Sequence, residues 1–315
     1  MARMQSNNVT LDFVIPNDPA SQYISIPQSL SLLNRKSYRD GYVYSVDYME
    51  FIGRAGDVLS IGKIPSGYTT HSSWRMGFEA WKEQRHSALE ETPGASPGKW
   101  SDFKCKFDID DVATSRIDPY GLAPNGGMSQ LSALGSEWIT STIFYNDIGT
   151  ATVSDVECGI LGPNIVGAYG ALIQTWGDTR AGTVAPDPNM PGPASTSWII
   201  RVGEEAGEMA RDVMNEVEGD NDLPPYANVV EDGTGPTPIY VGGELSAPGG
   251  VLSDVTTLGT TGRFTNMNGG LFPLGLMKLF PAWTDSTPGQ SRILRVHLSR
   301  GEYKGVAAAR MGDFS

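Results

Sequence analysis

The sequence predicts an all-β protein, a jelly-roll β-sandwich of about eight main strands with two helical insertions. Three observations predict this fold class. Glycine (38 residues) and proline (21 residues) are abundant without a regular repeat, which favours many turns and therefore many strands. Several runs alternate with the period of two that is typical of a strand. These runs follow one another at short spacing, whereas a βαβ protein would place a helix after nearly every strand.

Along the chain, residues 1–29 contain Pro16, Pro19 and Pro27 and no strong period, so we expect an extended N-terminal arm. Residues 30–315 are expected to form one jelly-roll domain. Its strand candidates are alternating or apolar runs bounded by turn residues, and they cover residues 42–52, 57–65, 100–109, 137–145, 152–161, 166–176, 269–280 and 291–300. The two halves of the chain share no visible repeat, which favours a single jelly roll over a two-barrel subunit.

The first helical insertion is expected near residues 72–91. Trp74, Phe78 and Trp81 are spaced by four and three residues, so they fall on one face of a helix. We interpret this apolar face as packing on the flank of a sheet, with a subunit interface as the alternative.

The second helical insertion is expected near residues 197–217, where Trp198 begins an apolar stripe opposite an acidic face. Trp198 has the same two interpretations as the first stripe, flank packing or a subunit interface. A turn-rich insertion follows over residues 219–257.

Composition excludes several classes of protein. The formal net charge is -13 and the pI is about 4.6, so the whole chain has no general attraction for nucleic acid or for anionic membranes. No apolar run reaches the roughly 20 residues that a membrane span needs, so we expect none. Cys105 and Cys158 are too few for a disulfide framework or a metal cluster, and we expect buried free thiols in strands.

The common catalytic and cofactor motifs are missing from the sequence, so we expect no enzyme and no cofactor. His71, His86 and His297 are widely separated and read as surface or packing residues. Two acidic clusters are weak Ca²⁺ candidates at most, because neither has the spacing of an EF-hand loop. They are Asp108, Asp110 and Asp111, and Glu218, Asp220 and Asp222.

One basic cluster precedes the strand expected at 42–52. Arg35, Lys36 and Arg39 surround Tyr38, a composition that can contact phosphates and stack a base. Charged residues at the entrance of an edge strand are the alternative, since they discourage unwanted strand pairing.

Seven short segments occur in an order that carries a resemblance. They are SLLNRKSYRDG (31–41), SIGKIP (60–65), WRMGFEAWKE (74–83), DFK (102–104), SWII (197–200), NDLPPY (221–226) and VHLSRGEYKG (296–305). Read together, they resemble capsid proteins of environmental circular Rep-encoding single-stranded DNA viruses.

This resemblance implies a structural coat protein in the virion, a jelly roll that self-assembles into an icosahedral shell (T=1 or larger) around DNA. Its partners would be other copies of the chain and possibly the viral genome. One feature departs from the family pattern, because many such proteins begin with a long basic arm and residues 1–29 here contain only Arg3. Arg35, Lys36 and Arg39 are then the best candidates for contact with the genome.

Two other functions fit a β-sandwich. A lectin-like carbohydrate-binding module would stack sugars on surface tryptophans, for which the candidates are Trp100, Trp138, Trp176 and Trp283. A glycosidase would use a pair of carboxylates, with Asp108 and Glu157 as the places to look.

Overall fold

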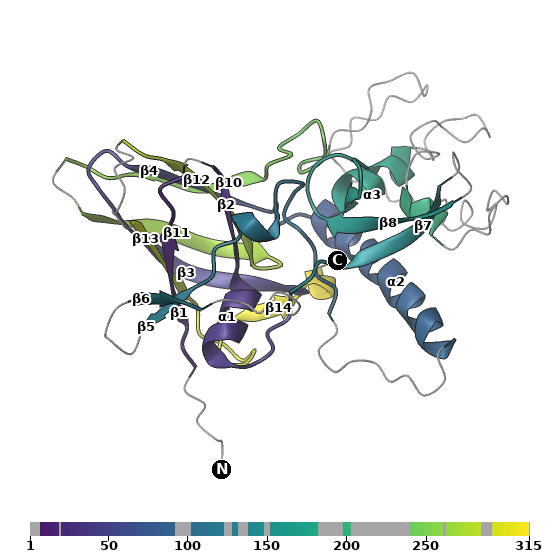
Figure 1. Cartoon of the computed structure of the whole chain (residues 1–315), viewed down its shortest axis with the longest axis horizontal. Coiled ribbons are helices and arrows are strands. Elements are labelled where there is room, and N and C mark those ends of the chain that lie inside the picture. The colour runs from purple at the N-terminus through teal and green to yellow at the C-terminus, as the bar shows by residue number, and fades with distance from the viewer. Residues whose placement is uncertain are drawn as a thin grey trace, which may run out of the picture. The chain divides into compact units, whose positions relative to one another are not determined.

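The computed structural model describes residues 7–18, 20–91, 102–122, 128–131, 138–147, 152–181, 198–202, 240–260, 263–284 and 292–314 (Figure 1). The chain divides into two compact units where the sequence predicted one domain over residues 30–315. Unit 1 comprises residues 1–66, 110–139 and 250–313, and unit 2 comprises residues 67–109, 140–249 and 314–315.

Unit 1 contains two antiparallel sheets, which Figure 1 shows as two layers. The first sheet has the order β1-β13-β3-β11, and β14 also pairs with β3. Its strands are β1 (Thr10–Ile15), β13 (Arg292–Leu298), β3 (Tyr42–Ile52), β11 (Phe264–Pro273) and β14 (Ala308–Arg310). The second sheet has the order β10-β4-β12-β2. Its strands are β10 (Val251–Thr257), β4 (Val58–Lys63), β12 (Leu276–Ala282) and β2 (Gln22–Ser25).

The two sheets share one hydrophobic core. Buried and less buried residues alternate strictly along β1 and β13, so each strand turns one face inward. The inward residues of both sheets belong to one cluster, which includes Leu11, Phe13, Tyr44, Phe51, Leu59, Ile61, Met277, Leu279, Leu294 and Val296. Two antiparallel sheets on one core are the arrangement of a β-sandwich, so the all-β expectation is confirmed for unit 1.

The N-terminal region differs from the expected extended arm. β1 and β2 belong to the two sheets, and residues Ile26–Asn34 form helix α1. Ser25 caps this helix by accepting a hydrogen bond from the Gln28 backbone N–H (3.4 Å). Pro27 fits the first turn, where its missing N–H removes no helical hydrogen bond. The prolines that suggested an irregular arm therefore separate short regular elements.

The run expected as one strand over 269–280 is split between the two sheets. Leu274 and Gly275 both have positive φ (57° and 63°), and the Gly275 N–H donates to the Phe272 carbonyl (3.0 Å). This tight turn carries the chain from β11 in the first sheet to β12 in the second. Because the residues on both sides of the turn are apolar, the sequence reads as one continuous strand.

Unit 2 has a small sheet and two helices. The sheet order is β7-β8-β9, with β8 and β9 parallel. The elements are α2 (Tyr68–Glu90), β7 (Thr142–Asp147), β8 (Thr152–Gly159), β9 (Tyr169–Ala171), α3 (Leu172–Ala181) and the short 3₁₀ helix η2 (Trp198–Arg201). The first predicted helix is confirmed and begins a turn earlier than expected. The second lies outside the described residues apart from residues 198–202.

Two strand predictions in unit 2 are wrong. Within the described part of 100–109, only Lys106 forms a β-bridge, with Gly159. The run 166–176 is a strand only at β9 and continues as α3, because an apolar run this short fits a buried helix as well as a strand.

The remaining elements lie in unit 1. The strands β5 (Tyr120–Leu122) and β6 (Met128–Gln130) form a two-stranded sheet, and η1 (Ala113–Ser115) precedes it. The 3₁₀ helix η3 (Met311–Phe314) begins in unit 1. The turn-rich insertion expected over 219–257 includes β10, while its residues 219–239 lie outside the described part of the chain.

Candidate nucleic-acid interface

The three predicted cations lie on the segment of unit 1 that joins α1 to β3. Arg35 caps the C-terminus of α1 in the left-handed conformation (φ 51°), so the helix ends there. Arg35 and Arg39 are exposed and Lys36 is half-buried, with its ammonium group donating a hydrogen bond to the Asn7 side-chain oxygen. The cluster is therefore open to an anionic ligand at two of its three positions.

The C-terminal segment of unit 1 brings two more cations to the same place. β14 pairs with the start of β3, which puts Arg310 opposite Tyr42. Just upstream, Lys304 and Gly305 (φ 51° and 93°) form the tip of a tight turn, closed by two backbone hydrogen bonds between Tyr303 and Val306. Lys304 and Arg310 are both exposed.

Specific contacts hold the two segments together. The Tyr38 hydroxyl donates to the Lys304 carbonyl (3.0 Å), and the Lys304 ammonium donates to the Ser37 carbonyl. The Arg39 backbone N–H donates to the Tyr303 hydroxyl (3.1 Å). Burial of Tyr38 raises the pKa of its phenol, so it stays a neutral donor. These bonds fix the position of the two segments through Tyr38, Tyr303, the Arg39 backbone and the Lys304 ammonium group, and none of them uses the Arg35 or Arg39 guanidinium group.

Two tyrosines lie among these cations. The rings of Tyr42 and Tyr303 are stacked, with centroids 4.1 Å apart and planes 20° apart. The Lys304 nitrogen lies 5.3 Å from the Tyr303 ring centroid, within cation–π range. The Arg310 guanidinium hydrogen-bonds the Tyr42 side chain, and this bond raises the pKa of the arginine. We call this set the basic tyrosine surface, defined by Arg35, Lys36, Arg39, Tyr42, Tyr303, Lys304 and Arg310.

The charge of the whole chain is unevenly divided. Unit 1 contains 14 of the 23 Lys and Arg residues and 14 of the 36 Asp and Glu residues, so its formal charge is zero. Unit 2 contains the other 9 and 22, which accounts for the entire -13. The sequence-wide charge therefore does not describe the sandwich. A groove or patch of cations with interleaved aromatic rings on a neutral unit can contact phosphates and stack unpaired bases.

The aromatic stripe of α2 packs within unit 2. Trp74 is buried and stacks on Phe78, with ring centroids 5.1 Å apart, and Trp81 packs on Phe103 at 5.6 Å. Trp81 is half-buried, and the Arg85 guanidinium lies over its ring. The described ring contacts of the stripe are therefore made within unit 2, to Phe103, which lies outside any strand, whereas the sequence predicted them on the flank of a sheet. The alternative, a subunit interface, stays a prediction.

Trp198, in η2, is also fully buried in unit 2. A Cβ added at Gly170 would lie 2.7 Å from the Trp198 indole nitrogen, so β9 approaches this ring closely. Trp198 is thus packed inside unit 2, like the aromatic stripe of α2.

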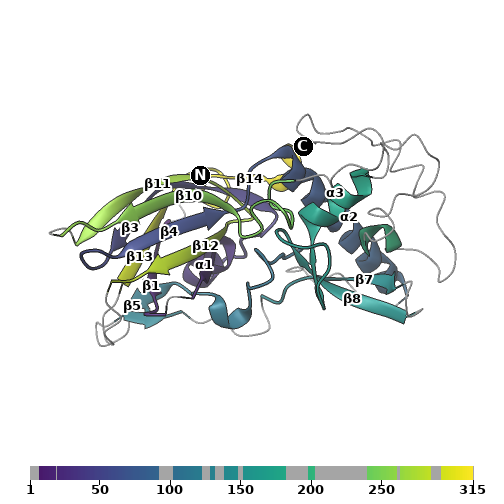
Figure 2. The ribbon, with the colours of Figure 1, turned by 90° about the horizontal axis from the view of Figure 1, so that it is seen from above.

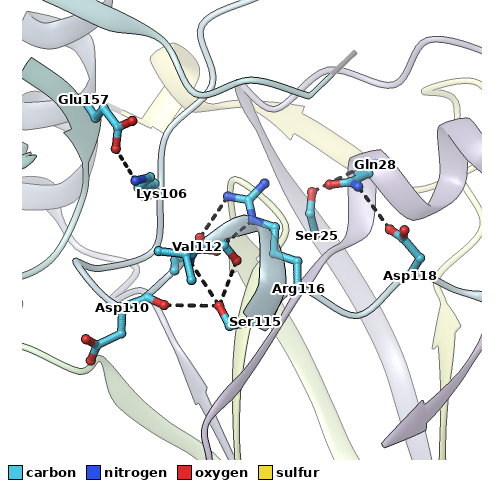
Figure 3. A network of polar contacts seen from close by, with 10 residues as sticks. Ser25, Gln28, Lys106, Asp110, Val112, Ser115, Arg116, Asp118 and Glu157 are labelled. Atoms are coloured by element: carbon cyan, nitrogen blue, oxygen red, sulfur yellow. Dashed lines mark hydrogen bonds and ion pairs between the residues drawn. The ribbon is translucent and has the colours of Figure 1, made fainter. Parts of the chain in front are cut away.

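One of the weak Ca²⁺ candidates, Asp111, is held in an ion pair. Asp111 is buried and forms a two-pronged ion pair with Arg116, at 2.7 and 2.9 Å. Figure 3 shows Arg116 next to the η1 turn, where Ser115 donates to the carbonyls of Asp110 and Val112. Among the described residues, no group of three or more His, Cys, Asp or Glu side chains is placed to hold a metal ion. The second acidic cluster, 218–222, lies outside the described residues.

Most of the residues proposed for a lectin or for a glycosidase are buried or contact another side chain. Trp176 is buried, Trp283 lies over the Arg292 guanidinium, and Trp138 is half-buried, while Trp100 lies outside the described residues. Glu157 is ion-paired with Lys106, as Figure 3 shows, and Asp108 is buried.

Both cysteines are free and buried, as predicted. Cys158 lies in β8, and burial together with the Glu157 charge raises the pKa of its thiol. Cys105 lies in the irregular segment that precedes the Lys106 bridge. A raised pKa keeps Cys158 in the unreactive thiol form.

Sequence reasoning missed four residues of the basic tyrosine surface. Tyr42 was assigned only to a strand, and Tyr303, Lys304 and Arg310 lie more than 260 positions from Arg39. The local signal was a tyrosine beside a lysine in a Gly-bounded turn, but only the strand pairing of β14 with β3 joins it to the N-terminal cluster.

Within the described residues, no helix has the length and apolar character needed to cross a membrane. Comparisons with protein-family models, curated proteins and solved structures found no match to this chain.

Proposed function

We propose that this chain is a viral capsid protein, a jelly roll whose copies assemble into an icosahedral shell around single-stranded DNA. The observation that carries the proposal is the strand pairing of the sandwich. Apart from the short β14, the strands of its two sheets are, in chain order, β1, β2, β3, β4, β10, β11, β12 and β13.

A jelly roll is a long antiparallel hairpin rolled into two sheets, so the first strand pairs with the eighth, the second with the seventh, the third with the sixth and the fourth with the fifth. The corresponding pairs here are β1–β13, β2–β12, β3–β11 and β4–β10, and all four are hydrogen-bonded and antiparallel. Rolling then adds β13–β3 and β12–β4 as new neighbours, and both of these pairs are also present. Six agreements of this kind support a jelly roll over other sandwich topologies.

Jelly rolls also occur in lectins and in cupin enzymes, so the fold alone does not select a coat protein. Two further points support that choice. The segments 31–41 and 296–305, which carry part of the resemblance to single-stranded DNA virus capsid proteins, pack against each other as the basic tyrosine surface. The formal charge of unit 1 is zero, so the sandwich that carries the basic tyrosine surface does not itself repel DNA, and the -13 of the chain lies in unit 2.

The test is light scattering behind size-exclusion chromatography on the purified full chain, followed by negative-stain images of the leading peak. We expect closed particles of megadalton mass, and nuclease-resistant DNA inside them when the chain is assembled with single-stranded DNA. A monomer of 33.8 kDa across salt concentration, pH and protein concentration would overturn the proposal. Empty shells that never protect DNA would overturn only its nucleic-acid part.

A further inference from the structure

Part of the outer face of the second sheet of unit 1, whose strands β10, β4 and β12 lie side by side in Figure 2, is apolar and exposed. Leu59 and Ile61 of β4 point into the core, so the alternate residues Ser60 and Gly62 point outward. Strand register places Leu252 of β10 beside Gly62, and it places Val255 of β10 and Phe280 of β12 on either side of Ser60. Leu252, Val255 and Phe280 are 63%, 51% and 39% exposed. Large exposed apolar side chains therefore lie on both sides of the half-buried Ser60, while Gly62 is itself buried.

The cationic residue Lys278, on the outward side of β12, is buried. The row that contains Leu252 and Gly62 continues to this lysine. Lys278 is only 5% exposed, and its ammonium nitrogen lies 5.2 Å from the Tyr23 ring centroid and 5.3 Å from that of Phe280. Tyr23 is 1% exposed, so this end of the row is covered and adds no charge to the surface. We call the exposed part the uncharged sheet face, defined by Leu252, Val255, Phe280 and Ser60.

The outer face of the first sheet is different. One of its rows runs through Asp12, Arg295 and Glu50, and the Arg295 guanidinium is 2.6 Å from the Asp12 carboxylate and 3.3 Å from that of Glu50. These charged side chains are 37% (Arg295), 34% (Asp12) and 26% (Glu50) exposed, so they are in contact with solvent. Apolar surface free of charge is typical of the centre of a protein interface, whereas a charged row is typical of ordinary surface.

We propose that the uncharged sheet face is a contact between two copies of this chain, arranged about a two-fold axis. Such a contact puts each residue near its own counterpart, so a charged face would bring like charges together, and this face avoids that. The charge distribution also selects a second copy. Copies that each carry -13 repel one another, but the entire excess lies in unit 2, so two neutral sandwiches meet at the lowest electrostatic cost.

This inference rests on the proposed self-assembly and names one surface through which two copies would meet. The variant that tests it is Leu252→Glu, which puts an acid at the most exposed apolar position of the face. Leu245→Glu is the matched control, because Leu245 is 69% exposed, lies in unit 2 and undergoes the same change of size and charge. Leu252→Lys also buries a charge in the proposed contact, but it lowers the total negative charge of the chain. It therefore distinguishes the cost of burying a charge from long-range repulsion between copies.

Association is measured by sedimentation and light scattering over a range of protein concentration, with thermal unfolding as the check on folding. We expect Leu252→Glu and Leu252→Lys to weaken association at least tenfold with unchanged unfolding, and Leu245→Glu to behave as the unmodified chain. Assembly of both Leu252 variants at the unmodified concentration would overturn the interface and leave the capsid proposal standing. Loss with Glu but not with Lys would also overturn it, since only repulsion would then be at work.

The unmodified chain separates the two proposals. A dimer that Leu252→Glu dissociates, with no larger particle under any condition, would support the uncharged sheet face and overturn the shell. A monomer at every concentration would overturn both.

Discussion

Arg292 and Asp57 form a two-pronged ion pair inside unit 1, with nitrogen–oxygen distances of 2.6 and 3.1 Å and side-chain exposures of 1% and 0%. Asn17 accepts a further hydrogen bond from the guanidinium, and the Trp283 ring lies 4.3 Å from it. The Arg54 backbone N–H donates to Asp57 (2.9 Å). A buried charge of either sign is tolerated here only because the other is present.

Removing one partner of this pair is expected to be costly. Asp57→Ala leaves the Arg292 charge buried and unpaired, which should lower the free energy of unfolding by about 3–5 kcal/mol. Asp12→Ala is the control, because the Asp12–Arg295 pair is about a third exposed and such pairs contribute about 1 kcal/mol or less. Urea unfolding of both variants checks the prediction, and equal losses would contradict it.

The same pair makes stability depend on pH. Burial alone would raise the pKa of Asp57, but the hydrogen bonds from Arg292 and Arg54 and the Arg292 charge outweigh burial and lower it. A lowered carboxyl pKa stabilises the folded state above the unfolded value of about 3.9, and this contribution is lost as pH falls through the folded value. Unit 1 should therefore lose stability below about pH 4, and Asp57→Asn should lose less than the unmodified chain over that range.

Asp178 in α3 gives the opposite dependence. Burial raises its pKa to about 6, a Gln174 hydrogen bond lowers it in part, and the Glu244 charge raises it again. The folded state then binds a proton more tightly than the unfolded chain, so the stability of unit 2 should rise as pH falls from above 6 towards 4. Asp178→Asn should remove this rise, as followed by urea unfolding at pH 7 and pH 5. A variant that keeps the full rise would show that another group is responsible.

Cations of the basic tyrosine surface should control binding of single-stranded DNA. Arg35→Ala with Arg39→Ala removes two exposed charges, which should weaken binding and reduce the slope of log affinity against log salt by about 1.4. Arg263→Ala is the control, an exposed arginine next to the opposite end of β3. Fluorescence anisotropy with an oligothymidine probe over a salt series measures both quantities. An effect of equal size per charge in Arg263→Ala would point to general electrostatics in place of a site.

The stripe on α2 should show a graded response. Trp74 is 6% exposed, so Trp74→Ala should cost about 3–5 kcal/mol, the range for large buried aromatic residues. Trp81 is half-buried, so Trp81→Ala should cost clearly less. Urea unfolding followed by circular dichroism ranks the two, and a larger loss for Trp81 would mean that the exposed half of its ring is covered in solution.

Helices and strands with a regular spacing of apolar residues could be predicted from the sequence. Strands whose formation depends on pairing with a distant part of the chain could not. β3, β4, β8 and β13 follow from alternation, and α2 from its aromatic spacing. β1 and β2 were missed because strands of six and four residues, one before Pro16 and one between Pro19 and Pro27, give too little pattern to outweigh those prolines. Their place in the sheets is set by β13 and β12, which lie more than 250 positions away along the chain.

The residues of the basic tyrosine surface also differ in how far the sequence predicts them. Arg35, Lys36 and Arg39 are neighbours in sequence, so their composition alone indicated a basic cluster. Lys304 and Arg310 join them only because β14 pairs with β3 and the Lys304–Gly305 turn is held by Tyr38. The ion pairs could not be predicted from the sequence either. No local rule predicts that Asp111 binds Arg116, which is why three neighbouring aspartates read as a weak cation site.

The pairing of β1 with β13 has a consequence for synthesis. Thr10 contacts His297 across 287 positions, so at about 5–20 residues per second β1 waits roughly 15–60 s for its partner to leave the ribosome. During that time Leu11 and Phe13 have no sheet to cover them, while the whole of unit 2 up to residue 249 has already emerged. Contacts this distant in sequence also fold slowly. The nascent sandwich is therefore the stage at which this chain most needs a chaperone.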